Sequence, residues 1–128
     1  MNLEELKYTR EHEWVRVKGD ECTIGITDYA QEELGDVVFV ELPDVGAATA
    51  RDKPFGAVES VKAVSDLFAP VSGEVVAVNG DLENAPETVN TDTYGEGWMI
   101  RVKLSDPGEI DSLMDAAAYQ KLVDELRS

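Results

Sequence analysis

One lysine stands in a setting that suits covalent modification. Lys62 lies between two apolar residues, Val61 and Ala63, at the point where two short strand-like runs meet. Acids flank it at Glu59 and Asp66. A hairpin that projects a lysine from an acidic surface could carry a long acyl group in amide linkage. Most lysines at hairpin tips are only solvated charges, so the pattern alone leaves both interpretations open.

Nucleophilic and metal chemistry have little support. His12 and Cys22 are the only residues of their types. In the hairpin expected below, Cys22 lies opposite Val17, which is five positions or roughly 16 Å from His12 at ~3.3 Å per residue. The numerous acids follow no calcium-loop spacing, and no phosphate-binding or nucleophile-elbow motif is present. We expect no metal site and no catalytic residue, with an acidic enzyme that uses two carboxylates as the alternative.

Composition limits the fold and the partners. The chain has 128 residues, of which 43% are hydrophobic, and this predicts one globular domain over residues 1–128 with a core from about 8 to 104. A formal net charge of −16 disfavours nucleic acid and anionic membranes and favours basic surfaces on partners. No stretch approaches the ~20 apolar residues of a membrane span, and no signal-peptide pattern begins the chain. We expect a cytoplasmic monomer, or the mature form of an imported protein.

The first part of the chain predicts a β-hairpin. Strands at residues 14–18 and 21–26 flank a Gly19-Asp20 turn. Glu13 falls at the open end of the apolar face, whereas Trp14 falls on the other, more polar face. Glu13 is therefore either a binding group at the mouth of a cleft or, more simply, a frayed strand end in solvent. The pairs set by the turn are Val17–Cys22, Val15–Ile24 and Glu13–Ile26.

The remaining pattern is mainly β with a helical C-terminus. We expect a short helix at residues 28–34, capped by Asp28 and stopped by Gly35. Two helices are expected between residues 107 and 126, with starts at Asp106 and Asp115. Trp98 is expected in the core. Further strands are expected at residues 37–42, 55–59, 64–68, 74–79 and 98–104, with loops at 44–54 and 80–97.

Several motifs together resemble one family of carrier proteins. Residues 59–66 (Glu-Ser-Val-Lys-Ala-Val-Ser-Asp) and 69–76 resemble the lipoyl-attachment hairpin of the glycine cleavage system H protein family. Biotin carrier domains set their lysine between two methionines. Lipoyl domains of 2-oxoacid dehydrogenases have an Asp before the lysine and lack terminal helices, so both fit less well. The likeness runs from about Lys7 to the C-terminus and also includes residues 12–14, 25–31, 34–43 and 94–98.

The resemblance implies a fold and a function. The fold would be mainly β, a barrel-sandwich hybrid like lipoyl and biotinyl carriers, built from short antiparallel strands with one internal helix and two C-terminal helices. The chain would not be an enzyme but would carry lipoate on Lys62, attached by a lipoate ligase or lipoyl transferase. It would shuttle an aminomethyl intermediate from glycine decarboxylase (P protein) to aminomethyltransferase (T protein), with reoxidation by dihydrolipoamide dehydrogenase (L protein). The alternative is a relay protein that donates lipoate to other acceptor domains.

The resemblance also implies roles for individual residues. Glu13 and Asp66 become the candidates to hold the ammonium end of a loaded arm. The chain departs from some members at Glu11, where they have serine, and at Glu33, where they have histidine. Hydrogen bonds to a charged group, ~1.5–3 kcal/mol each, nearly offset the roughly 0.5–1.5 kcal/mol per immobilised side chain, so we expect reversible docking. The residues implied around the attachment point are Glu59, Ser60, Val61, Lys62 and Ala63.

Overall fold

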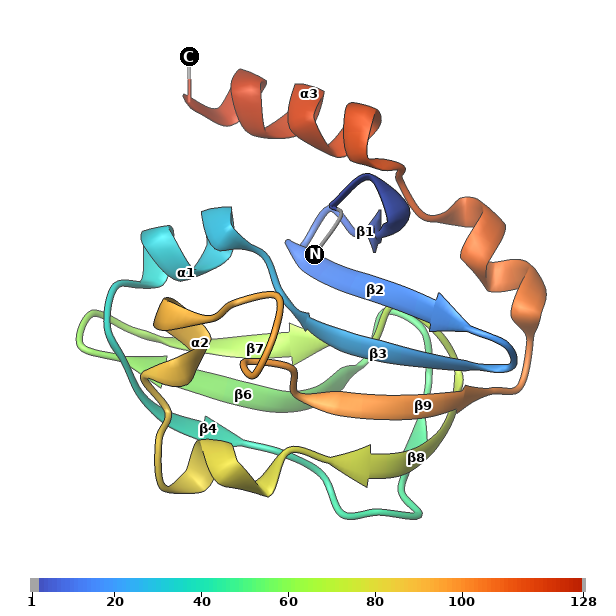
Figure 1. Ribbon diagram of the computed structural model, residues 1–128, viewed down its shortest axis with the longest axis horizontal. Coiled ribbons are helices and arrows are strands. Elements are labelled where there is room, and N and C mark those ends of the chain that lie inside the picture. The colour runs from blue at the N-terminus through green and yellow to red at the C-terminus, as the bar shows by residue number, and fades with distance from the viewer. Residues whose placement is uncertain (1–2, 128) are drawn as a thin grey trace.

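Two antiparallel sheets form the body of the protein (Figure 1). The structure is a computed structural model that describes residues 3–127. Neither sheet closes into a barrel, and the mainly β prediction is confirmed. The larger sheet has the order β1 (Lys7–Tyr8), β2 (Glu13–Lys18), β3 (Glu21–Ile26), β9 (Ile100–Leu104), β8 (Gly73–Val78) and β5 (Ala48–Thr49). The smaller sheet has the order β4 (Val37–Glu41), β6 (Pro54–Ser60) and β7 (Val64–Phe68).

The inner faces of the sheets share the core. The Gly19-Asp20 turn sets the predicted pairs Val15–Ile24 and Val17–Cys22, and only Val17, near the turn, is exposed. Because side chains alternate across a strand, the same hairpin sends one set of residues inward. One buried cluster lies on the larger sheet and contains Val15, Cys22 and Ile24. Another cluster joins the two sheets and includes Ile26, Val37, Val40, Val58 and Leu67. Burial of these apolar surfaces is the main force that holds the sheets together.

Trp14 is buried although it lies on the outer face of the larger sheet. The sequence predicted that this face would be the polar one, and at Trp14 the prediction is wrong. The C-terminal helix covers this end of the sheet, so Trp14 joins a separate cluster with Tyr8, Tyr119 and Val123. Gly25 lies directly beneath the indole, where a Cβ would come within 2.7 Å of the ring.

Short helices complete the fold. The expected pair at the C-terminus is a 3-10 helix followed by an α-helix, with Asp106 and Asp115 accepting from the first turns as predicted. The predicted loop at 80–97 contains two short helices. Within residues 3–127, no helix is long and apolar enough to cross a membrane. The helices are η1 (Leu3–Glu5), α1 (Asp28–Leu34), η2 (Gly80–Glu83), α2 (Thr88–Thr91), η3 (Pro107–Ser112) and α3 (Ala116–Arg127).

Candidate functional site

Lys62 lies exposed at the tip of the β6–β7 hairpin. The tip is closed by Ser60, whose backbone N–H donates to the carbonyl of Ala63 over 2.8 Å. The Ser60 hydroxyl oxygen accepts the N–H groups of Lys62 and Ala63, each over 3.1 Å. One buried hydroxyl thus satisfies two donors of a turn that has no room for a regular ladder. The backbone of the tip is fixed while the lysine side chain extends into solvent.

The tip also rests on the junction between α1 and β4. The N–H of Val61 donates to the carbonyl of Asp36 over 3.0 Å. A Cβ placed on Gly35 would lie 3.3 Å from Cε of Lys62, so the lysine stem passes directly over this glycine. Gly35 has φ 79°, which favours glycine, and it ends α1 as predicted. The stem of Lys62 therefore packs against the C-terminal end of α1.

A cavity of about 310 Å³ opens between α1, β7 and the start of β2. Four carboxylate residues line it, and no lysine or arginine does. Leu34 and Ala30 of α1 contribute apolar wall close to the residue over which the Lys62 stem passes. We call this the acidic cavity. Its lining is Glu11, His12, Glu13, Ile26, Tyr29, Ala30, Glu33, Leu34, Val58, Ser65, Asp66 and Leu67.

Glu13 is the buried carboxyl group of this cavity. Its exposed fraction is 2%, so the expectation of a strand end frayed into solvent is wrong. Thr9 Oγ1 donates to Oε1 over 2.5 Å, and the N–H of Phe68 donates to Oε2 over 3.4 Å. Burial raises the pKa of Glu13 to about 7, although these two hydrogen bonds lower it, and Glu11 and Asp52 add to the rise. Near neutral pH this carboxyl group can exchange its proton.

A second cavity, of about 330 Å³, lies against the same glutamate. It shares Glu11 and Glu13 with the acidic cavity but is also lined by Arg10 and Arg51. The two guanidinium groups offset two of the three carboxylates of this second cavity, which are Glu11, Glu13 and Asp52, whereas the acidic cavity has four carboxylates and no guanidinium in its wall. A cationic group that approaches Glu13 is therefore favoured on the side of α1.

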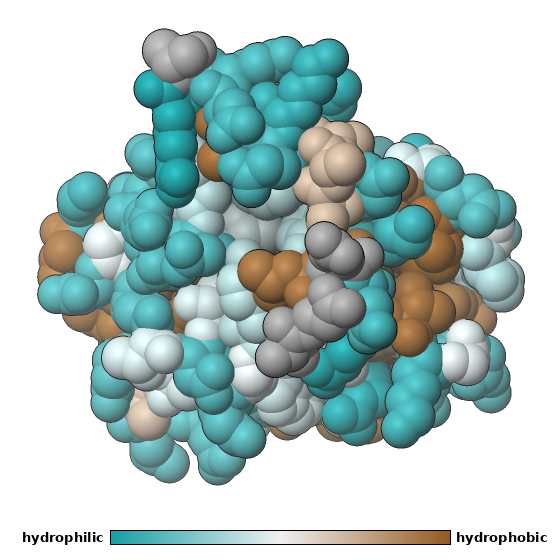
Figure 2. All heavy atoms as spheres, turned by 45° about the horizontal axis from the view of Figure 1, so that its top comes forward, coloured by the Kyte–Doolittle hydropathy of each residue, from teal (hydrophilic) through white to brown (hydrophobic). Residues whose placement is uncertain are grey.

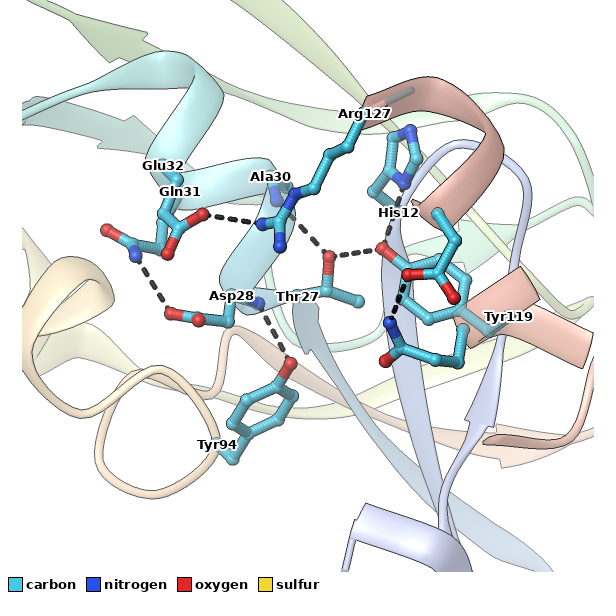
Figure 3. Close-up of polar contacts among 11 residues, drawn as sticks. His12, Thr27, Asp28, Ala30, Gln31, Glu32, Tyr94, Tyr119 and Arg127 are labelled. Atoms are coloured by element: carbon cyan, nitrogen blue, oxygen red, sulfur yellow. Dashed lines mark hydrogen bonds and ion pairs between the residues drawn. The ribbon is translucent and has the colours of Figure 1, made fainter. Parts of the chain in front are cut away.

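The C-terminal helix braces the wall of the acidic cavity (Figure 3). The Tyr119 hydroxyl of α3 lies 2.9 Å from Nδ1 of His12 and 2.6 Å from Oγ1 of Thr27. Burial lowers the pKa of His12, against the opposing effect of Glu11 and Glu33. The apolar spacing of the sequence predicted a helix here. No pattern in the sequence indicated that Tyr119 would contact His12, which is 107 positions away.

Thr27 also begins α1. Its side chain accepts the N–H of Ala30 over 3.3 Å, so the N-cap is Thr27 and the predicted cap at Asp28 is wrong by one residue. Asp28 instead accepts from the Gln31 side chain over 2.8 Å. At the far end of α3, Arg127 forms a 2.7 Å ion pair with Glu32 (Figure 3). These contacts connect both ends of α3 to α1, which carries part of the cavity wall.

Comparison with known proteins identifies the family. The model of the glycine cleavage H-protein family matches residues 6–126. This chain belongs to the glycine cleavage H-protein family. It is 60% identical over 122 residues to the glycine cleavage system H protein of Anaeromyxobacter sp. (strain K), covering 95% of each chain. It is 62% identical over 120 residues to that of Brevibacillus brevis, covering 94% of this chain and 95% of that relative. A crystal structure of a glycine cleavage system H protein from Mycobacterium marinum matches with a TM-score of 0.87 and 39% identity, over 94% of this chain and 98% of that one.

Within this family fold, the residues singled out by the sequence form two groups, and Glu59 lies outside both. Glu13 and Asp66 both line the acidic cavity, together with Glu11 and Glu33. Glu59 is exposed on β6, opposite Val64, and does not line the cavity. The second group surrounds the hairpin tip and comprises Ser60, Val61, Lys62 and Ala63.

Proposed function

We propose that this chain is the lipoate-bearing carrier of the glycine cleavage system and that lipoate is attached to Nζ of Lys62. One observation carries the assignment within the family: an exposed lysine at a fixed hairpin tip, whose stem passes over Gly35, next to a residue that lines the acidic cavity. In the attachment step with lipoate and ATP, the neutral ε-amine attacks the carbonyl carbon of a lipoyl adenylate; the amide C–N bond forms, the C–O bond to AMP breaks, and AMP and one proton depart. When attached, the lipoyl group would supply a disulfide that is reduced as it takes up an aminomethyl group, and its dithiol form is what would be reoxidised between rounds.

The chain's own residues guide and shelter such an arm. Ser60 holds the backbone of the tip, and Gly35 leaves space for the lysine stem. An arm that folds back past Gly35 meets the apolar wall made by Leu34 and Ala30. Such a wall suits a mostly aliphatic chain and excludes water from its end.

Glu13 makes the shelter depend on charge. Because burial raises its pKa to about 7, Glu13 can take up or release a proton near neutral pH. An ammonium group nearby favours the ionised form and lowers this pKa, so Glu13 releases its proton as the cation enters. A neutral arm end gains no such ion pair. The cavity therefore retains a cationic end and releases a neutral one, which a carrier that visits several enzymes requires.

A carrier of this kind works with several partner enzymes. Glycine decarboxylase, aminomethyltransferase and dihydrolipoamide dehydrogenase would act on the arm in turn, and a lipoate ligase or lipoyl transferase would attach it. The chain would act as a cytoplasmic monomer with no catalytic role of its own. The strongly negative net charge, −16, favours partners with basic docking surfaces.

The decisive experiment is an intact-mass measurement after incubation with a lipoate–protein ligase, lipoate and ATP. The wild-type chain should gain one lipoyl increment, and Lys62→Arg should gain none. The lipoylated wild type should then support exchange of bicarbonate with the glycine carboxyl group in the presence of glycine decarboxylase. Addition of the lipoyl group at another lysine, or no exchange by the lipoylated chain, would refute the proposal.

A further inference from the structure

Large apolar side chains gather in solvent around the hairpin tip. Val61 and Val64 are 66% and 67% exposed, and Val38 and Phe39 of the adjacent strand are 49% and 50% exposed. Figure 2 shows hydrophobic atoms at the left end of the molecule, where Figure 1 places the tip of the β6–β7 hairpin, set among hydrophilic ones. We call these four residues the tip patch. Apolar surface clustered within a polar rim marks an interaction site more often than scattered apolar residues do.

A β-bulge creates half of this patch. The register of β4 against β6 runs from Val37–Ser60 to Phe39–Glu59, so Val38 is an extra residue on β4. Strict alternation would turn Phe39 toward the core. The bulge instead places Val38 and Phe39 both in solvent, between the buried Val37 and Val40. The chain thus exposes a phenylalanine that a regular strand would bury.

The patch flanks Lys62 on both sides. Val61 is tied to Asp36, just before β4, by its backbone hydrogen bond. Phe39, Glu59 and Val64 form one row across the three strands of the smaller sheet. Apart from Lys62 itself, the exposed charged residues on β4, β6, β7 and the residue before β4 are acidic: Asp36, Glu41, Glu59 and Asp66. A complementary surface would have an apolar centre and a basic rim.

The chemistry of attachment identifies the occupant. Before acylation, the ε-amine extends from the backbone by no more than the length of one lysine side chain. The acylating enzyme must therefore contact the residues beside Lys62. After acylation, the much longer arm can reach an active site without close contact at the tip. We propose that the tip patch is the docking surface of the enzyme that acylates Lys62, and that this enzyme presents an apolar recess to Phe39 and Val64 and basic groups to the acidic rim. This inference rests on the proposed function.

Acylation kinetics test the docking surface directly. The probe is a lipoate–protein ligase with lipoate and ATP, and the readout is the lipoyl increment by intact mass against time. Phe39→Ser and Val64→Ser should each lower kcat/KM about tenfold through KM, because each removes an apolar anchor. The matched controls are Leu126→Ser and Val45→Ser, at 51% and 64% exposure in other parts of the molecule. Both controls should be acylated like the wild type.

The thermal midpoints of all four variants should stay close to that of the wild type, since at least half of each changed side chain is exposed. Raising the salt concentration should raise KM, because the rim is charged. Wild-type kcat/KM in both Phe39→Ser and Val64→Ser would overturn the inference. So would equal losses in the two controls. Failure of the wild-type chain to be acylated at Lys62 would instead refute the proposed function.

Discussion

The hairpin tip and the acidic cavity hold their ionisable groups in opposite ways. At the tip, backbone hydrogen bonds to the Ser60 hydroxyl fix the turn, and Lys62 itself extends into solvent. In the cavity, Glu13 is 2% exposed and its pKa rises to about 7 because burial disfavours its charge. A group that must be reached by other proteins is positioned by local backbone contacts. A group that must respond to a cation is positioned by long-range burial.

The largest expected effect comes from the buried side of this comparison. A carboxyl group with a pKa of about 7 in the folded state and an ordinary one when unfolded binds more protons in the folded state. The stability that this proton binding adds to the folded state is complete when the pH is below the ordinary pKa of a glutamate. It is lost as the pH rises through about 7. The wild type should therefore lose about 3 kcal/mol of unfolding free energy relative to Glu13→Gln between pH 4.5 and pH 8.

Urea denaturation of both proteins across this pH range gives the difference. Asp66→Asn is the matched control, because it changes an exposed carboxylate of the same cavity. A dependence on pH that is seen with Glu13→Gln and not with Asp66→Asn would assign the effect to the buried carboxyl group. A pH-independent difference between the wild type and Glu13→Gln would mean that Glu13 keeps the ordinary pKa of a solvated carboxylate.

The next effect lies at the junction between the two regions. Gly35→Ala should destabilise the fold by about 1–3 kcal/mol, because φ 79° with ψ −158° is a glycine conformation. The new Cβ would also come within 3.3 Å of Cε of Lys62 and displace its stem. Gly19→Ala is the control: Gly19 has φ 64° but no atom within 4 Å of the added Cβ.

Both glycine variants should unfold at lower urea concentration than the wild type, but only Gly35→Ala should slow acylation of Lys62. Equal acylation of the two would show that the lysine stem has no fixed course over α1. The measurement thereby separates a backbone effect, common to both variants, from a contact that only one of them disturbs.

Local features of this fold could be predicted from the sequence, whereas its long-range contacts could not. The β2–β3 register was predictable because a two-residue turn permits one pairing, and the Lys62 hairpin was predictable from its strand pattern and its family resemblance. The burial of Glu13 was not, since its partner Phe68 is 55 residues away in the chain. The contact between Tyr119 and His12 spans 107 residues and uses a hydroxyl on a helix whose spacing indicates only packing.

The smallest effect concerns the cap of the tip. Ser60→Ala removes the acceptor for two backbone N–H groups and should cost about 1 kcal/mol of unfolding free energy, since water can replace part of the lost bonding at an exposed turn. Acylation of Lys62 should slow more than this stability loss explains, because the turn no longer holds one conformation. Ser60→Thr keeps the hydroxyl and should restore both properties, whereas Ser105→Ala, at an exposed serine elsewhere, should alter neither. If Ser60→Ala is acylated at the wild-type rate, the turn is held by the backbone bonds of Ser60 and Val61 alone, and the tip needs no side-chain cap.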